Sequence, residues 1–228
     1  MRRGRGRRRR GRPGACAASW RGVWTVTARN CRLRLGGRAP HRNDHDVQDS
    51  RTAHGAEPAS PFVARCAAFA RPGASVLDLA CGRGRHARLF AERGHGVTAV
   101  DRDALALRDL DTIAGITTRC LDLEDGDWPL AQVTFGVVVV TNYLWRPRFA
   151  ELVECLEPGG LLIYETFAVG HERYGRPSRP EFLLQRNELF ERLSPVADVI
   201  VFEQGDRRFL DGDGYPAACV QRIACARR

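Results

Sequence analysis

The chain has 228 residues, of which 43% are hydrophobic, and this is enough for one globular domain with its own core plus an appendage. Its formal net charge is +9, but residues 1–42 contain 14 of the 36 basic residues and no acidic residue, so the remainder holds 22 Arg against 27 Asp and Glu. The remainder is therefore mildly acidic, which argues against a nucleic-acid-binding domain, and no apolar run approaches the roughly 18–20 residues of a membrane helix.

The basic and sulfur-containing residues indicate the kind of cell and compartment. Every basic residue is Arg, and Arg, Ala, Gly and Pro can all be written in GC-rich codons, so we expect a GC-rich bacterial gene. The eight Cys include no C-x-x-C pair and accompany no paired His cluster, so no metal site is expected. Cysteines among apolar neighbours favour the reducing cytoplasm. A secretory signal is not expected, because the N-terminus has no uninterrupted apolar segment.

Residues 1–58 are expected to form a basic, disordered extension, and residues 59–228 the domain. The chain opens with MRRGRGRRRRGR, and Arg, Gly and Pro continue to about Arg42, so self-repulsion and low hydrophobicity oppose folding. Three interpretations remain open: an arm that binds RNA phosphates, an organellar transit peptide, or an upstream extension that is not native, with the natural start near Val47.

From residue 75 onward, hydrophobic patterns predict strands that alternate with helices. Four consecutive valines in 134–141 indicate a strand covered on both faces, and Asp103 is placed to cap the helix after the second strand. The first five strands are expected at 75–80, 96–100, 116–121, 134–141 and 161–165, with helices at 85–93, from 103, and at 147–156. Glu157-Pro158-Gly159-Gly160 should end the third helix, and a helix at 187–193 with strands at 197–203 and 217–224 completes the order.

This alternation predicts an α/β fold, a Rossmann-like, doubly wound sheet of about seven mostly parallel strands with helices on both faces. The last two strands are joined without a crossover helix, so the last strand should be antiparallel. In such sheets ligands bind beyond the carboxyl ends of the strands, near the point where strand order reverses. Functional residues are therefore expected just after strands one to five.

The segment between the first strand and the first helix carries the most specific pattern. Gly82, Gly84 and Ala87 match the dinucleotide-binding pattern G-x-G-x-x-A. However, Asp78 lies in the end of the strand, and two residues separate the strand from the first glycine, where a dinucleotide site normally has none. A carboxylate at that position can accept hydrogen bonds from the amides of the turn, and it places negative charge near a cationic ligand.

The pattern D-x-A-x-G-x-G at residues 78–84 resembles the first motif of class I S-adenosylmethionine (SAM)-dependent methyltransferases. The usual motif has Gly where this chain has Ala80, which makes the turn less permissive. The resemblance continues from Val76 to Phe167. More loosely, from Ser60 to Arg227, the chain resembles small bacterial methyltransferases of the tellurite-resistance type. The resemblance implies SAM as the cofactor.

The resemblance also implies roles for single residues. Gly82 and Gly84 would let the backbone approach the methionine part of SAM, and Asp101 would accept the ribose hydroxyls. In the loop after strand three, Asp122 would receive the adenine amine and Leu123 would cover the ring, although a solvated loop charge is an alternative for Asp122. The expected SAM-binding residues are Asp78, Ala80, Gly82, Gly84, Arg85, Asp101, Arg102, Asp122, Leu123, Thr141 and Asn142.

The segments after strands four and five should select the methyl acceptor. Asn142 and Tyr143, in TNYLWRP, should face the transferable methyl, and this stretch lacks the two prolines of the box in methyltransferases that act on the amino groups of bases. After strand five, AVGHERYGRPSRPEFLL has the composition of a lid that binds an anionic or small polar acceptor, with solvated loop charge as the alternative for each Arg. The expected catalytic residues are Tyr143, His171 and Glu165, and the expected acceptor-binding residues are Arg146, Tyr174 and Arg176.

The sequence thus predicts an enzyme that transfers a methyl group from SAM to a small-molecule acceptor by in-line displacement. A soft nucleophile would need no general base, whereas an oxygen or amine nucleophile would use His171 or Glu165. Three alternatives remain: an RNA methyltransferase that uses the basic arm, an NAD-dependent oxidoreductase, which Asp78 disfavours, and a SAM-binding protein without catalysis. We expect a cytoplasmic monomer or homodimer with no membrane partner.

Overall fold

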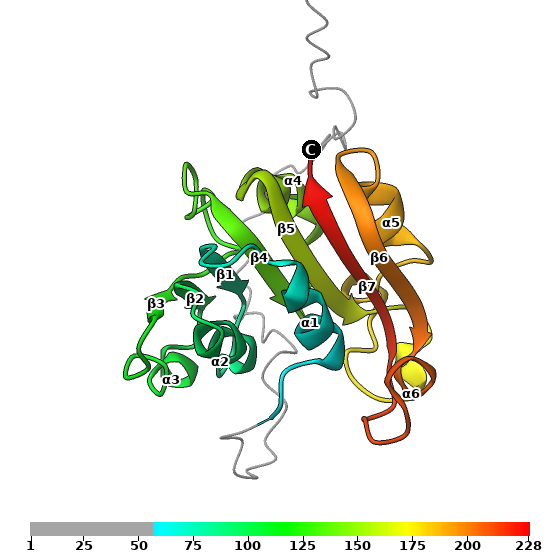
Figure 1. Cartoon of the computed structure of the whole chain (residues 1–228). Coiled ribbons are helices and arrows are strands. Elements are labelled where there is room, and N and C mark those ends of the chain that lie inside the picture. Colours follow the sequence, from blue (N-terminus) through cyan, green and yellow to red (C-terminus); the bar gives the residue numbers. More distant parts are fainter. Residues whose placement is uncertain (1–56) are drawn as a thin grey trace, which may run out of the picture. The chain divides into compact units, whose positions relative to one another are not determined.

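The computed structural model describes residues 57–228, and the rest of the expected N-terminal extension lies outside these residues. Seven strands form one sheet in the order β3-β2-β1-β4-β5-β7-β6 (Figure 1). The strands are β1 (Val76–Leu79), β2 (Val97–Asp101), β3 (Ile116–Cys120), β4 (Phe135–Thr141), β5 (Leu156–Phe167), β6 (Ala197–Asp206) and β7 (Cys219–Arg227). The helices are α1 (Pro61–Cys66), α2 (Arg85–Glu92), α3 (Ala104–Leu107), α4 (Phe149–Glu154), α5 (Glu188–Leu193) and α6 (Arg207–Asp211).

The direction of the strands confirms the predicted fold class. β1 to β5 pair in parallel, and β7 lies antiparallel between β5 and β6. β6 therefore runs in the same direction as β1 to β5, so the carboxyl ends of six strands lie at one edge of the sheet. Strand order reverses between β1 and β4, and the segments after these strands are where a ligand is expected.

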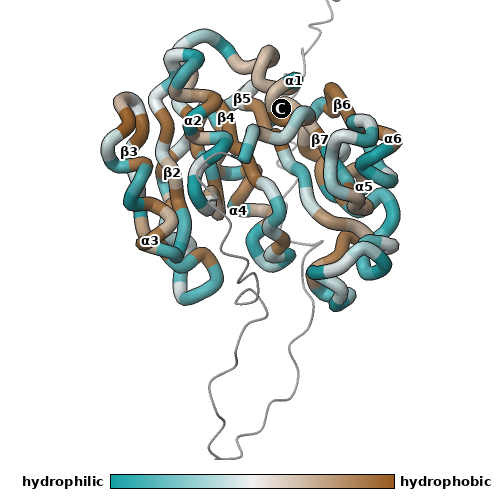
Figure 2. The backbone as a smooth tube through the Cα atoms, turned by 90° about the horizontal axis from the view of Figure 1, so that it is seen from below, coloured by the Kyte–Doolittle hydropathy of each residue, from teal (hydrophilic) through white to brown (hydrophobic). Residues whose placement is uncertain are grey.

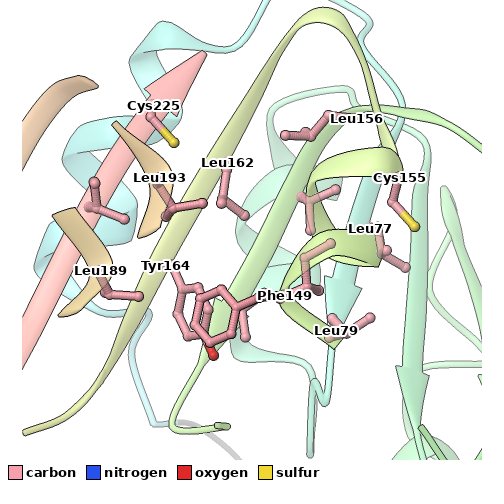
Figure 3. Close-up of a cluster of buried hydrophobic side chains, with 14 of the residues drawn as sticks. Leu77, Leu79, Phe149, Cys155, Leu156, Leu162, Tyr164, Leu189, Leu193 and Cys225 are labelled. Carbon is pink, nitrogen blue, oxygen red and sulfur yellow. The ribbon is translucent and has the colours of Figure 1, made fainter. Parts of the chain in front are cut away.

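Helices cover both faces of the sheet because side chains alternate along each strand. On one face, α1 and α2 contribute Phe62 and Phe90 to a core that includes Val76 and Val137 of the strands. On the other face, Phe149 of α4 stacks on Tyr164 of β5 with ring centroids 5.6 Å apart, and Leu189 and Leu193 of α5 join them (Figure 3). Hydrophobic residues follow the strands, and the connecting segments are mostly hydrophilic (Figure 2). In the described part of the chain, no helix has the length and hydropathy to cross a membrane.

Three local features differ from the sequence prediction. Leu156 already pairs with Phe135, so β5 begins before the Glu157–Gly160 turn, which forms an irregularity inside the strand where Gly159 has a φ of 72°. The short helix α6 occupies the connection between β6 and β7, which was expected to be a turn. Helix α1 was not predicted, because its six residues are too few to show a helical period.

Candidate active site

The turn between β1 and α2 is built from three residues with left-handed backbone conformation. Ala80, Gly82 and Gly84 have φ values of 53°, 54° and 71°, a region that glycine adopts without strain. A Cβ atom at Gly82 would meet nothing within 4 Å, whereas a Cβ atom at Gly84 would lie 2.4 Å from Cδ1 of Leu110. A side chain at Gly84 would therefore have to displace Leu110, whereas Gly82 leaves the backbone open to a ligand.

Two carboxylates from neighbouring strands hold the turn. Asp101, at the end of β2, accepts hydrogen bonds from the N–H groups of Gly82 at 2.7 Å and Asp103 at 2.9 Å. Asp78, in β1, accepts from the N–H of Ala87 at 2.8 Å. The expectation that Asp78 binds the amides of the turn is therefore wrong in detail: Asp78 binds the first turn of α2, and Asp101 binds the glycine.

The environment of Asp78 gives its carboxyl group an unusual charge state. The side chain is fully buried, and its Oδ1 has no hydrogen-bond partner. Burial, with a smaller contribution from the negative charge of Asp101, raises the pKa of Asp78 to about 7, although the N–H of Ala87 and the charge of Arg85 act to lower it. A cationic ligand at the turn would favour the ionised carboxylate. An unpaired buried oxygen beside an open glycine turn fits the positively charged sulfonium of SAM.

The remaining residues that were expected to bind the cofactor around this turn have different degrees of exposure. Arg85 begins α2 and lies 3.6 Å from the carboxylate of Glu57. Arg102 and Asp122 are exposed in the segments after β2 and β3. Leu123 is buried in the core and is only 5% exposed. The structure places these residues after the strands as expected, and their individual contacts with SAM stay predictions.

The carboxyl end of β4 carries a histidine contact that the sequence analysis missed. The ring of His86, in α2, is buried between Ser60, whose N–H donates to Nε2 at 3.2 Å, and Thr141, whose Oγ1 lies 3.3 Å from Nδ1. Since Nε2 accepts a hydrogen bond, the ring proton of the neutral imidazole is on Nδ1 and points to Thr141. Burial lowers the pKa of His86 to about 3, so the ring stays neutral. The sequence signal that could have identified His86 is its position inside the G-x-G-x-x-A pattern.

Asn142 and Tyr143 follow directly at the end of β4. Asn142 is exposed with a left-handed φ of 53°, and its N–H donates to the carbonyl of Glu165 at 2.9 Å. The hydroxyl group of Tyr143 is buried without a partner, and burial raises the pKa of Tyr143 above its ordinary value. Tyr143 is therefore a neutral phenol that can donate a hydrogen bond, and it is not a ready base.

Glu165 does not have the surroundings of a general base. Its side chain is 1% exposed, accepts a 2.6 Å hydrogen bond from Oγ of Ser60, and lies 3.2 Å from the guanidinium groups of Arg207 and Arg222. Both carboxylate oxygens of Glu165 thus contact groups of the protein itself, which argues against the expected catalytic role of Glu165. Its role is to join β5 to β7, α6 and the segment before α1.

His171 remains the candidate for proton transfer after β5. It is 5% exposed, stacks on Phe167 with ring centroids 4.1 Å apart, and its Nε2 lies 3.1 Å from the carbonyl oxygen of Arg176. Its Nδ1 is buried without a hydrogen-bond partner, and burial lowers the pKa of His171. A neutral ring with one nitrogen unpaired could accept a proton from an acceptor, and this role stays a prediction.

The three residues expected to bind the acceptor are not available as a group. Arg146 donates to Glu188 at 2.8 Å and to the carbonyls of Glu181 and Leu183, so it fastens the segment after β5. The hydroxyl group of Tyr174 donates to Asp206. Only Arg176 is exposed. The structure thus corrects the roles of Arg146 and Tyr174, whose polar groups bind the protein itself.

Known proteins are similar to this chain in sequence and in fold. Residues 76–160 match the family described as "Methyltransferase domain". Demethylmenaquinone methyltransferase of Renibacterium salmoninarum is 30% identical over 123 residues, which are 50% of this chain and 50% of that protein. The tRNA U34 carboxymethyltransferase of Methylococcus capsulatus is 30% identical over 156 residues, which are 60% of this chain and 45% of that protein.

The fold is similar to that of TehB from Haemophilus influenzae, with a TM-score of 0.58 at 19% identity over 73% of this chain and 61% of that chain. The chain thus spans about half the length of the two sequence relatives. The matched region runs from β1 into β5 and contains the glycine turn with both of its carboxylates. Motif, strand order and sequence similarity agree: residues 76–160 are similar to the methyltransferase domain, and the fold is that of the class I SAM-dependent methyltransferases.

Proposed function

We propose that the protein transfers the methyl group of SAM to a small-molecule acceptor. The observation that carries the proposal is the glycine turn between β1 and α2, which Asp101 holds through the N–H of Gly82. In the neighbouring strand β1, the buried Oδ1 of Asp78 has no hydrogen-bond partner among the described residues. When bound, SAM supplies an electrophilic methyl group on a sulfonium that is a good leaving group.

The chemistry left to the protein is alignment and exclusion of water. Gly82 allows close approach of the backbone, and Asp101 anchors the turn and orients the sugar side of the site. Asn142 and Tyr143 follow β4, where the acceptor would meet the methyl group. Since Glu165 is committed to two arginines, a soft nucleophile that needs no base is favoured, and His171 is the one proposed base for other acceptors.

The names of the sequence relatives point to two kinds of methyl acceptor, a small molecule and an RNA. Demethylmenaquinone methyltransferase acts, by its name, on a small molecule, and the mildly acidic part of the chain after residue 42 favours a small molecule over RNA. A cytoplasmic location and a monomeric or homodimeric state belong to the same proposal.

Calorimetric titration of the full chain with SAM, S-adenosylhomocysteine and NAD tests the proposal. We expect SAM and S-adenosylhomocysteine to bind and NAD not to bind. Asp101→Ala should weaken SAM binding at least tenfold. Asp103→Ala is the matched control, because Asp103 only caps α3 through the N–H of Leu105. Tight binding of NAD with no binding of SAM would overturn the proposal.

A second candidate is a methyltransferase that acts on RNA, which the similarity to tRNA U34 carboxymethyltransferase and the 14 Arg of residues 1–42 favour. Deletion of residues 1–46 should then abolish RNA binding and turnover on RNA while SAM still binds. Unchanged RNA binding after this deletion would dismiss the RNA methyltransferase.

A further inference from the structure

A network of buried charged side chains joins β5, β6 and β7 near the edge of the sheet where a ligand is expected. Arg222 of β7 has a fully buried side chain and pairs with Glu165, with Glu203 at 3.1 Å, and with Asp211. Arg65 of α1 adds contacts of 2.9 Å to Glu203 and 3.5 Å to Asp211. These contacts satisfy the carboxylates from several sides.

Among the described residues, Arg207 makes fewer ion pairs than Arg65 or Arg222 in this network. It is the first residue of α6, directly after the carboxyl end of β6, and its side chain is 15% exposed. In the part of the chain that the structure describes, its one ion pair is the 3.2 Å contact from Nη2 to Oε1 of Glu165. Ser60 and Arg222 contact Oε2 of the same carboxylate. Its Nε is buried with no hydrogen-bond partner.

The charged groups that act on Arg207 are two arginines and two carboxylates. Burial lowers the pKa of Arg207, and the charges of Arg222 and Arg85 lower it further, while Glu165 and Asp211 raise it. A ligand carboxylate that reaches Arg207 would supply an acceptor for its unpaired Nε.

The position of Arg207 relative to the methyl-transfer site is set by β5. Glu165, the partner of Arg207, pairs in the sheet with Thr141, and its carbonyl accepts the N–H of Asn142. Glu165 therefore connects Arg207 to the end of β4, where the acceptor is expected. Arg146 and Tyr174, which the sequence suggested for this role, bind Glu188 and Asp206 instead.

We propose that Arg207 binds a carboxylate of the methyl acceptor, so that the acceptor is a small organic acid. This inference rests on the proposed methyltransferase function. A guanidinium group matches a carboxylate in a planar, two-point geometry that Lys does not reproduce. Its partial burial strengthens the pair, because the local dielectric constant is lower than in water. Arg207 would thereby select the acceptor and orient it toward the methyl group.

Fluorine NMR with the full chain saturated with S-adenosylhomocysteine tests this inference. The probes are 4-fluorobenzoate and its neutral analogue 4-fluorobenzamide. We expect the benzoate to bind at least tenfold more tightly than the benzamide. Arg207→Gln should remove this preference, and Arg207→Lys should restore only part of it. Arg71→Gln is the control, because Arg71 is an exposed arginine paired with Glu157 and should leave the preference intact.

Equal affinity for the two probes, absence of binding by both, or an unchanged preference in Arg207→Gln would overturn the inference. Binding of S-adenosylhomocysteine to each variant shows that the variant is folded and reports separately on the cofactor site. The probe titration is also made without S-adenosylhomocysteine. If S-adenosylhomocysteine did not bind the unmodified chain, the proposed function would fail while the carboxylate test could still be read.

Discussion

In the two halves of the sheet, different kinds of hydrogen bond stabilise the edge where a ligand is expected. In the half around β1 and β2, carboxylates bind backbone amides close in sequence: Asp78 reaches Ala87 over 9 positions, and Asp101 reaches Gly82 over 19. In the half around β5 to β7, side chains bind side chains, and Ser60 reaches Glu165 over 105 positions. The first arrangement is encoded in one short motif, whereas the second exists only once the sheet has formed.

This difference separates the two tasks of the site. A cofactor common to a whole family can be bound by a conformation of the backbone, which glycines and two carboxylates define. An acceptor that differs between relatives has to be selected by side chains, and we propose that these come from the segments around β5, β6 and β7. We therefore expect substitutions in the first half to change SAM binding, and substitutions in the second half to change stability or acceptor choice.

The largest effect is expected from Arg222→Met. This change leaves the carboxylates of Glu165 and Asp211 buried, at 1% and 0% exposure, without their central cation. Removing one partner of a buried pair costs about 3–5 kcal/mol, and urea unfolding measures the loss. Arg71→Gln breaks the exposed pair with Glu157 and should cost about 0–1 kcal/mol. A loss for Arg222→Met as small as that of the control would show that the network does not hold the second half together.

A change of pH should test the first half, through Asp78. Its native pKa of about 7 lies above the ordinary value near 4, so the native state keeps a proton that the unfolded state loses. The contribution of Asp78 to the free energy of unfolding is fully present below pH 4. It is lost as the pH rises from 4 to 7, which lowers the free energy of unfolding by about 4 kcal/mol.

Asp78→Asn keeps an oxygen that can accept the hydrogen bond of Ala87, and it does not titrate. Urea unfolding between pH 4 and 8 should therefore show the variant gaining stability relative to the unmodified chain as the pH rises. A difference between the two proteins that stays constant over this range would contradict the raised pKa.

The sequence was sufficient for most of the fold and for the first half of the site. Alternating patterns placed all seven strands, and the four valines identified β4, whose seven residues are all buried. The second half was not predictable in the same way, because Arg146, Glu165 and Arg222 have partners far along the chain. The sequence predicts Arg146 as an acceptor residue, and it does not reveal the partner Glu188, which lies 42 positions later. An Arg inside the apolar strand pattern CVQRIACAR was the one signal of the buried network.

A smaller loss should follow Gly84→Ala, since its new Cβ atom would overlap Leu110. We expect about 2–3 kcal/mol from overpacking together with the left-handed φ of 71°. Gly73→Ala is a matched control, because Gly73 has a φ of 70° and nothing within 4 Å of the added atom. It should cost about 1 kcal/mol from backbone strain alone. Equal losses in the two variants would mean that Leu110 moves aside and that packing does not require the glycine.

The smallest effect is expected where the chain departs from the usual motif. Ala80 has a left-handed φ of 53°, which costs a residue with a Cβ atom about 1–2 kcal/mol. Ala80→Gly removes this strain but gives the unfolded chain more freedom, worth about 0.4–1 kcal/mol. We expect the variant to be more stable by about 0.5 kcal/mol. Ala150→Gly, on the exposed side of α4, should instead lose up to about 1 kcal/mol. If both variants lose stability, the turn holds Ala80 without strain, and the glycine that other members of the family have there serves ligand approach alone.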